Sequence, residues 1–228
     1  MNLSVIIPTF NEAAEIGACL NHLQALRARG CEISVVDGGS TDDTAALARP
    51  HADRVIITAR GRALQMNSGA QAANAEVLLF LHADARLAEN ADAAILEGLR
   101  RSGKSWGHFD VRISSRHPLL RMVESLMNLR SRVTKVATGD QGLFVTRELF
   151  HAIGGFPPIA LMEDIALSKI LRQHGAPLCL KKKISVSARR WETRGVWRTI
   201  FLMWRLRLAY FLGADPKRLA LAYDERKY

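Results

Sequence analysis

Three groups of acidic residues stand where they could take part in chemistry. Asp37 follows the apolar run at residues 33–36, and Asp84 ends the apolar run VLLFLHAD. Glu163 and Asp164 are adjacent and come directly after the turn-forming sequence GGFPPIALM. Carboxylates bind hard divalent cations, and a carboxylate within reach of a hydroxyl can remove its proton. These four side chains are therefore the first candidates for a ligand-binding or catalytic site.

Asp37 lies in the segment VVDGGSTDDT, where two glycines follow the acid. Glycines let the backbone turn tightly and approach a ligand closely. The Asp37 carboxylate could then accept hydrogen bonds from a nucleobase or a ribose. Aspartate is equally common as the cap of a following helix, and this motif alone favours neither interpretation.

The other acids also have two interpretations. A cation on Asp84 would take further ligands from substrate phosphates and water, and His82 lies on the same side of the expected strand. Taken alone, an aspartate at the end of a strand is more often a turn or capping residue. Glu163 and Asp164 could supply a general base, but acids at a helix start are also explained by the helix dipole.

Arg60, Arg62 and Gln65 stand at the start of an expected helix. A helix N-terminus with guanidinium groups favours anions, so these side chains could face a diphosphate. A solvated helix face explains each of them equally well.

The elements that would position these residues alternate between strand and helix. Apolar runs predict strands at residues 3–7, 33–36, 55–58 and 77–81, and a helix is expected to follow residue 37 with Ser40 or Thr41 as its cap. Another helix is predicted at 63–75. This alternation predicts a parallel, doubly wound sheet, whose ligands bind at the carboxyl ends of the strands. Asp37 and Asp84 both fall at that edge.

Beyond residue 104 the alternation is looser. We expect strands at 108–114 and 142–145 and helices at 119–133 and 161–174. Residues 195–213 are strongly apolar and aromatic, but three arginines interrupt them. No apolar run approaches the roughly 20 residues needed to span a bilayer.

Composition limits the class of protein. A chain of 228 residues with 48% hydrophobic content suits one large α/β domain with an appendage. Three widely spaced cysteines indicate neither a disulfide framework nor a zinc site, and MNLSVIIPTF predicts a first strand rather than a signal peptide. We therefore expect a cytoplasmic protein. The net charge of +10 favours anionic partners, namely nucleotides, anionic lipid headgroups or nucleic acid.

Several segments together resemble a known family. SVIIPTFNE, VVDGGSTDDT, GRALQMNSGA, LLFLHADARL and ATGDQGLFVTRELFHAIGGFPPIALMEDIAL are similar, in order and spacing, to the family 2 glycosyltransferases with the GT-A fold, over residues 3–175. The LHAD variant, between GRALQMN and GDQG, resembles the small bacterial branch of arsenosugar-biosynthesis or radical-SAM-associated glycosyltransferases. The resemblance implies an α/β fold with a mostly parallel sheet flanked by helices. It implies a GT-A domain at 1–185 and a C-terminal helical extension at 186–228, packed on the domain or peripheral to a membrane.

The resemblance also implies roles for individual residues. Asp164 matches the catalytic base, with Glu163 beside it, and Asp84 matches the metal ligand for Mg²⁺ or Mn²⁺. His82 departs from the first acid of the family's DXD motif. The expected nucleotide-sugar site, which includes the three helix residues named above, consists of Pro8, Thr9, Phe10, Glu12, Asp37, Arg60, Arg62, Gln65, His82, Ala83, Arg190 and Trp191.

The implied activity is an inverting, metal-assisted transfer of one sugar from a nucleotide-diphosphate donor to a hydroxyl of a small-molecule or lipid-linked acceptor. Ser187 stands where processive members have the Gln of QxxRW, which favours a single transfer. One alternative is a polyisoprenyl-phosphate glycosyltransferase at the cytoplasmic membrane face. The other is a non-catalytic nucleotide or nucleic-acid binder, which only the charge supports. Because we recognise no helix-turn-helix, zinc module or RNA-binding strand, we expect no nucleic-acid partner.

Residues 191–212 have two interpretations of their own. An aromatic helix with arginines is compatible with peripheral contact at the inner membrane face. It is also compatible with packing on the sheet, with the arginines reaching water or the active site.

Overall fold

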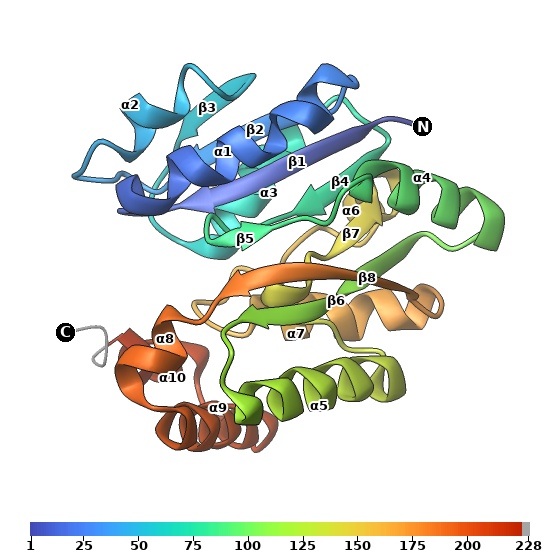
Figure 1. Ribbon diagram of the computed structural model, residues 1–228. Helices are drawn as coiled ribbons and strands as arrows, with labels where there is room; N and C mark the ends of the chain where they lie inside the picture. The colour runs from blue at the N-terminus through green and yellow to red at the C-terminus, as the bar shows by residue number, and fades with distance from the viewer. Residues whose placement is uncertain (225–228) are drawn as a thin grey trace.

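The chain folds around one eight-stranded sheet, in the strand order β3-β2-β1-β4-β7-β6-β8-β5 (Figure 1). The structure is a computed structural model and describes residues 1–224. Residues 225–228, the end of the expected C-terminal extension, lie outside the described residues. The strands are β1 Leu3–Thr9, β2 Glu32–Asp37, β3 Arg54–Ile57, β4 Val77–Phe80, β5 Ala85–Arg86, β6 Trp106–Ser114, β7 Phe144–Thr146 and β8 Leu178–Ser187.

Helices cover both faces of this sheet (Figure 1). The chain also forms two short 3₁₀ turns, at Gly139–Gln141 and Arg172–His174. The α-helices are α1 Ala13–Ala28, α2 Thr44–Ala48, α3 Arg62–Ala72, α4 Ala91–Ser102, α5 Pro118–Thr134, α6 Arg147–Ala152, α7 Glu163–Leu171, α8 Arg189–Arg194, α9 Val196–Phe211 and α10 Pro216–Asp224.

The strand pairing confirms the predicted, mostly parallel α/β sheet and shows that the sheet is mixed. β1 pairs in parallel with β2 and β4, β2 with β3, and β6 with β8. The antiparallel pairs are β4 with β7, β6 with β7, and β5 with β8. The carboxyl ends of β1, β2 and β4 therefore meet at one edge, as the alternation of strands and helices predicts.

Alternation along β1 explains the two layers. Val5 and Ile7 pack with α1 on one face, whereas Ile6 packs with α3 on the other. Gly69 of α3 permits a close approach, because a Cβ there would lie 2.4 Å from Ile6 Cγ2. This contact fixes the position of α3 along β1. The first residue of α3, Arg62, therefore lies at the carboxyl edge of the sheet.

Two element boundaries differ from expectation. The helix after β2 begins at Thr44 with Asp43, rather than Ser40 or Thr41, at the N-cap position, and the Asp42 carboxylate accepts the Thr44 amide at 3.1 Å. Ser40 and Thr41 remain in the loop because side chains of neighbouring loops bind their backbone amides. The expected domain boundary at residue 185 lies inside β8, which continues to Ser187.

The chain after β8 forms α8, α9 and α10. Leu202 and Leu206 of α9 pack against Met162 and Ile165 near the start of α7, and Leu219 of α10 joins this cluster. Within residues 1–224, no helix is both long and apolar enough to cross a membrane.

Candidate functional site at the carboxyl edge of the sheet

The loops after β1 and β2 are fastened to each other. Asn11, in a left-handed conformation with φ 53°, accepts the Thr41 amide at 2.9 Å and donates its own amide to Ser40 Oγ at 2.8 Å. Glu12 donates its amide to Thr44 Oγ1 at 2.8 Å. The backbone at this edge is therefore ordered by the chain's own hydrogen bonds, before any ligand binds.

Asp37 organises the second of these loops. Its Oδ2 accepts the Ser40 amide at 2.9 Å, and its Oδ1 accepts Thr9 Oγ1 at 3.3 Å and the Ser40 hydroxyl. The residue is buried at the end of β2, and the next helix begins seven residues later. The capping interpretation of Asp37 is therefore wrong. Its carboxylate instead lies among the loops that the resemblance assigns to the nucleotide.

Gln65 does not face the edge, which corrects our expectation for this residue. It is buried, and its Nε2 donates to the carbonyls of Thr9 at 2.7 Å and Val36 at 2.8 Å. A Cβ on Gly38 would lie 3.2 Å from this amide. Gln65 thus holds the ends of β1 and β2 together and has no hydrogen left to donate to a diphosphate.

Phe10 and Arg60, expected in the site from different segments, are brought together. The guanidinium carbon of Arg60 lies 4.3 Å from the centre of the Phe10 ring. Cation–π stacking of this kind holds the guanidinium flat against the ring. The stacked Phe10 and Arg60 side chains form an ordered surface beside the loop that contains Asp37.

The loop after β4 meets the 3₁₀ turn at Gly139–Gln141 and the start of α7. His82 Nδ1 lies 3.4 Å from Asp140 Oδ1, and the Gly139 amide donates to Asp164 Oδ2 at 2.7 Å. A Cβ on Gly139 would lie 2.7 Å from His82 Nε2, so only glycine allows the imidazole this close. Sequence reasoning quoted Asp140 within GDQG but gave it no role. Its position as an acid between two matched motifs was the available signal.

Two arginines face this acidic cluster. Partial desolvation would lower the pKa of Arg62, but neighbouring carboxylates raise it overall: those of Glu163, Asp140, Asp164 and Asp84. Burial lowers the pKa of Arg190 overall, although Asp140 and Asp84 oppose it. Arg62 from α3 and Arg190 from α8 thus lie near the same carboxylates. The cluster therefore contains both positive and negative side chains.

The pKa of Asp140 shows how closely these groups interact. Desolvation would raise it, but the hydrogen bond and charge of His82, together with Arg190 and Arg62, hold it well below its usual range. The Asp140 carboxylate therefore stays ionised beside His82 throughout the physiological pH range.

Glu163 and Asp164 occupy different environments although they are adjacent. Glu163 is buried, and burial followed by the Asp164 charge raises its pKa. Asp164 is half-buried, and its Oδ1 accepts the Ile165 amide at 2.7 Å. This bond supports the interpretation that Asp164 interacts with the N-terminus of its own helix. The Gly139 amide, which lies outside that helix, also holds the carboxylate. When two neighbouring acids differ in burial, the more buried one tends to stay protonated and neutral, and the other can accept a proton.

A narrow cavity of about 10 Å³ lies between this cluster and the sheet. It has room for about one water molecule. His82 and Asp164 line its polar side, and Phe80 and Phe156, whose ring centres are 4.8 Å apart, line its apolar side.

Within the described part of the chain, no group of three or more His, Cys, Asp or Glu residues is arranged to hold a metal ion. Asp84, half-buried directly after β4, is the matched candidate. One carboxylate fits a hard cation that takes its remaining ligands from phosphates and water, as Mg²⁺ commonly does, and does not fit a fully protein-bound ion.

Two further expected residues are less accessible than predicted. Ala83 is buried, and the half-buried Trp191 packs against the large core cluster. Because Trp191 packs against the core, it is less open to a nucleotide sugar than the resemblance implies. Arg190 instead stacks over the Tyr223 ring, 4.7 Å from its centre.

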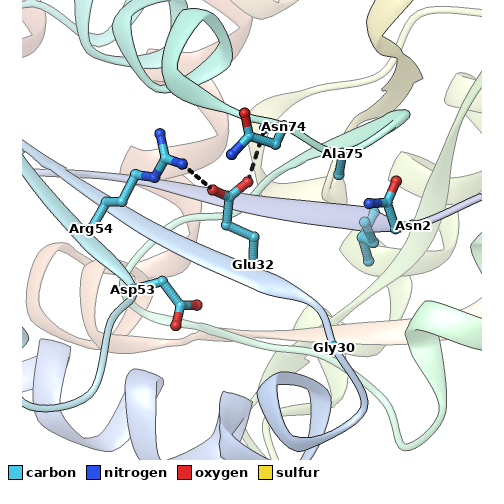
Figure 2. A pocket seen from close by; sticks show the side chains of 8 residues that line it. Asn2, Gly30, Glu32, Asp53, Arg54, Asn74 and Ala75 are labelled. Atoms are coloured by element: carbon cyan, nitrogen blue, oxygen red, sulfur yellow. Dashed lines mark hydrogen bonds and ion pairs between the residues drawn. The ribbon is translucent and has the colours of Figure 1, made fainter.

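A larger hollow of about 420 Å³ lies at the opposite edge, where β1 and β2 begin (Figure 2). Glu32 points into it and is paired with Arg54 at 3.1 Å and with the Asn74 amide at 3.1 Å. The charges of Glu32 and Arg54 neutralise each other, and no residue of the matched motifs lines this hollow. The carboxyl edge of the sheet is therefore the better candidate for the functional site.

The chain is similar to known proteins in sequence and in fold. A model of glycosyl transferase family 2 matches residues 4–156, more than half of the chain. A PGL/p-HBAD biosynthesis glycosyltransferase of Mycobacterium tuberculosis (strain ATCC 25618 / H37Rv) is 42% identical over 93 residues, which are 38% of this chain and 36% of that protein. The chain thus matches only a little over a third of that relative's length.

Solved structures share the fold of this chain. The mannosyltransferase PcManGT from Pyrobaculum calidifontis, in complex with GDP-Man and Mn²⁺, has a TM-score of 0.69 at 21% identity, covering 99% of this chain and 64% of that one. S. aureus TarS 1-349, in complex with UDP-GlcNAc, has a TM-score of 0.66 at 18% identity, covering 82% and 58%. At these identities the likeness shows a common fold.

Proposed function

Because the chain belongs to glycosyltransferase family 2, we propose that it transfers a sugar from a nucleotide-diphosphate donor to an acceptor hydroxyl, with inversion. One observation carries the proposal. Segments far apart in sequence bring a carboxylate cluster and two arginines together at the carboxyl edge, directly beside the fastened loops after β1 and β2. Since the family consists of enzymes, we do not retain the non-catalytic binder as an alternative.

The donor nucleotide is assigned to the loops after β1 and β2. Pro8, Thr9 and Glu12 supply the first loop, Asp37 the second, and the Phe10–Arg60 pair the adjoining surface. The complexes of PcManGT with GDP-Man and of TarS with UDP-GlcNAc support a nucleotide-sugar donor of this kind.

The diphosphate is assigned to the arginines and to a metal. Asp84 would hold Mg²⁺ or Mn²⁺, which would neutralise negative charge on the leaving nucleoside diphosphate. Arg62 and Arg190 add fixed positive charge beside it. A leaving group stabilised in this way needs no proton, so the site requires a base but no separate acid.

Asp164 is assigned as that base. It takes the proton of the acceptor hydroxyl while the acceptor oxygen attacks the sugar C1 and the bond from C1 to the diphosphate oxygen breaks. The amides of Gly139 and Ile165 hold its carboxylate in one orientation. Attack from the face opposite to the diphosphate inverts the anomeric centre. Ser187, in place of the Gln of QxxRW, supports a single sugar transfer to each acceptor rather than processive addition.

A second candidate acceptor class has its own observation. Arg130 of α5 lies within electrostatic reach of both Arg207 of α9 and Asp164. Two nearby guanidinium groups beside the base favour an acceptor that carries a phosphate, as a polyisoprenyl phosphate does. An acceptor with only hydroxyl groups would leave this positive charge unpaired.

The narrower placement in the arsenosugar or radical-SAM-associated branch stays a prediction, as does a cytoplasmic location. The division into a GT-A domain at 1–185 and an extension at 186–228 also stays a prediction, except that β8 carries the first part to Ser187. The branch prediction is tested by offering arsenic-containing ribosides, among other hydroxyl acceptors, to the purified protein.

The proposal is tested with the purified protein, GDP-, UDP-, ADP- and CDP-sugars, and Mg²⁺ or Mn²⁺. A donor that binds only the folded state raises the melting temperature. We expect one donor class to do so in a metal-dependent way, and Asp84→Ala to remove that dependence. Asp164→Asn should keep the shift but lower the release of nucleoside diphosphate by about 10²–10⁴-fold.

Glu97→Gln, an exposed change on α4, is the matched control and should alter neither readout. Full turnover by Asp164→Asn would refute its assignment as the base. Absence of any donor-induced shift would refute the proposed donor site.

A further inference from the structure

Helix α9 exposes a continuous apolar stripe. Trp197, Phe201, Trp204, Leu208 and Phe211 each expose more than half of their surface. Their spacing of four and three residues places them on one side of the helix. Because Leu202 and Leu206 on the other side pack against the start of α7, the stripe points away from the domain.

Helix α5 exposes a second stripe of the same kind. Met122, Leu126, Leu129 and Val133 follow the same spacing and are 47–72% exposed. Figure 1 shows α5 and α9 along the same lower edge of the molecule. We call these nine side chains on the two helices the α5–α9 face.

Hydrogen bonds fix the orientation of α5, so its apolar stripe cannot turn inward. Asn128 accepts the Val111 amide at 2.8 Å and donates to the Val111 carbonyl at 3.0 Å. Glu124 is buried and accepts the Ile113 amide at 3.0 Å. These polar residues of α5 bind the backbone of β6 beside the buried Leu120 and Val123, and the apolar stripe is left on the outer side of the helix. An ordinary surface helix carries polar residues on its outer side, so this exposed apolar stripe is unusual.

Positive charge is concentrated around the α5–α9 face. Residues 116–135 and residues 196–218 each contain five basic residues and one acidic residue. Together they hold eight of the ten excess positive charges of the chain. Arg116, Lys135, Arg198 and Arg205 are exposed at the ends and sides of the stripes.

The same helices reach the catalytic cluster. Burial and the neighbouring Arg207 lower the pKa of Arg130 to about 10, and Asp164 opposes them. Arg130 of α5 and Arg207 of α9 thus connect the α5–α9 face with the proposed base.

We propose that the α5–α9 face docks the protein on the surface of an anionic lipid bilayer, without spanning it. Tryptophan and phenylalanine favour the boundary between headgroups and acyl chains, and flanking arginines favour lipid phosphates. A second copy of the chain fits this face less well, because a symmetric contact would oppose positive charge to positive charge. This docking is independent of the transfer chemistry, but it would bring a lipid-linked acceptor to the site.

The full chain should float with vesicles of phosphatidylcholine mixed with phosphatidylglycerol, bind pure phosphatidylcholine weakly, and dissociate as salt rises. Brominated lipids should quench Trp197 and Trp204 but not Trp106, which is buried in the core. Trp197→Ser/Phe201→Ser/Trp204→Ser should lower the partition coefficient by about tenfold or more, because three large apolar groups no longer leave water.

Leu47→Ser/Ile57→Ser removes exposed apolar side chains elsewhere and should leave vesicle binding unchanged. Arg198→Gln/Arg205→Gln, which leaves the stripe intact, should reduce the preference for phosphatidylglycerol. Equal binding by the triple variant would overturn the proposal. A second result would also overturn it: no binding of the wild-type protein to vesicles with or without phosphatidylglycerol, together with a wild-type dimer in light scattering that is absent in the triple variant.

Discussion

The donor side and the acceptor side of the site are built differently. On the donor side, the Asn11 side-chain oxygen, the Asp37 carboxylate and the Gln65 side-chain nitrogen are paired within the chain. On the acceptor side, Arg130 Nε and Nη2 are buried without a hydrogen-bond partner among residues 1–224, and Glu163 is buried with a raised pKa. One side is thus ordered before binding, whereas the other keeps unpaired charge that a ligand can satisfy.

Gly139 lies where the two sides meet, and Gly139→Ala should have the largest effect. The new Cβ would displace the His82 imidazole and the loop that holds Asp164. A misplacement of this size costs on the order of 10²-fold in turnover, which steady-state release of nucleoside diphosphate would measure. Gly17→Ala on α1, where a Cβ meets nothing within 4 Å, is the control and should keep full turnover. Equal turnover in both variants would show that the close contact is dispensable.

Gln65→Leu tests whether the order of the donor side depends on this one amide. It leaves the Thr9 and Val36 carbonyls without their side-chain donor. We expect a loss of about 2–4 kcal/mol in the free energy of unfolding, measured with urea, and weaker donor binding. Gln24→Leu removes a similar pair of bonds, to the Leu20 and His51 carbonyls, far from the site. It should lower stability but keep donor affinity, and a matching loss of affinity would argue against a local role for Gln65.

Arg130→Met tests the unpaired charge of the acceptor side. Removing a buried cation that lacks a partner and lies near Arg207 should leave stability unchanged or raise it. For a phosphate-bearing acceptor, KM should rise about tenfold with the donor affinity unchanged. Arg132→Met, on the same helix, breaks the two bonds to Asp110 at 2.7 and 2.8 Å and should destabilise the protein. If Arg130→Met proved the more destabilising of the two, Arg130 would have a structural partner.

Glu163→Gln should give the smallest effect, visible in the pH dependence of stability. The pKa of Glu163 is higher in the folded than in the unfolded protein, so the folded state binds the proton more tightly. Wild-type stability should therefore fall as pH rises through the range above the ordinary pKa of glutamate. The melting temperature of Glu163→Gln should exceed that of wild type near neutral pH and approach it in acid. Glu124→Gln, which loses the ion pair with Arg121, should be less stable at neutral pH, opposite in sign.

Much of the donor side could be predicted from sequence because local signals specify it. Largely apolar runs mark β1, β2 and β4. Asp37 at the end of β2 and Asp84 in the loop after β4 fall at one edge once the strands are parallel. Gln65 was the exception. Helical periodicity placed it at the start of α3 but did not reveal that its amide points inward to two carbonyls.

The acceptor side was less predictable. An amphipathic helix was expected at 119–133, but sequence alone did not show that β6 would attract the polar residues of α5 and leave its apolar stripe in water. Likewise, Asp140 became a candidate only when the 3₁₀ turn brought it to His82.

The sequence by itself determined the order of strands and helices, the family, and the acids at the strand ends, because periodicity and short motifs act over a few neighbouring residues. The tertiary structure alone decided the contact of His82 with Gly139 and Asp140, the burial of Gln65, and the exposure of the stripes on α5 and α9. Such contacts depend on how distant elements pack, and packing is a property of the whole chain.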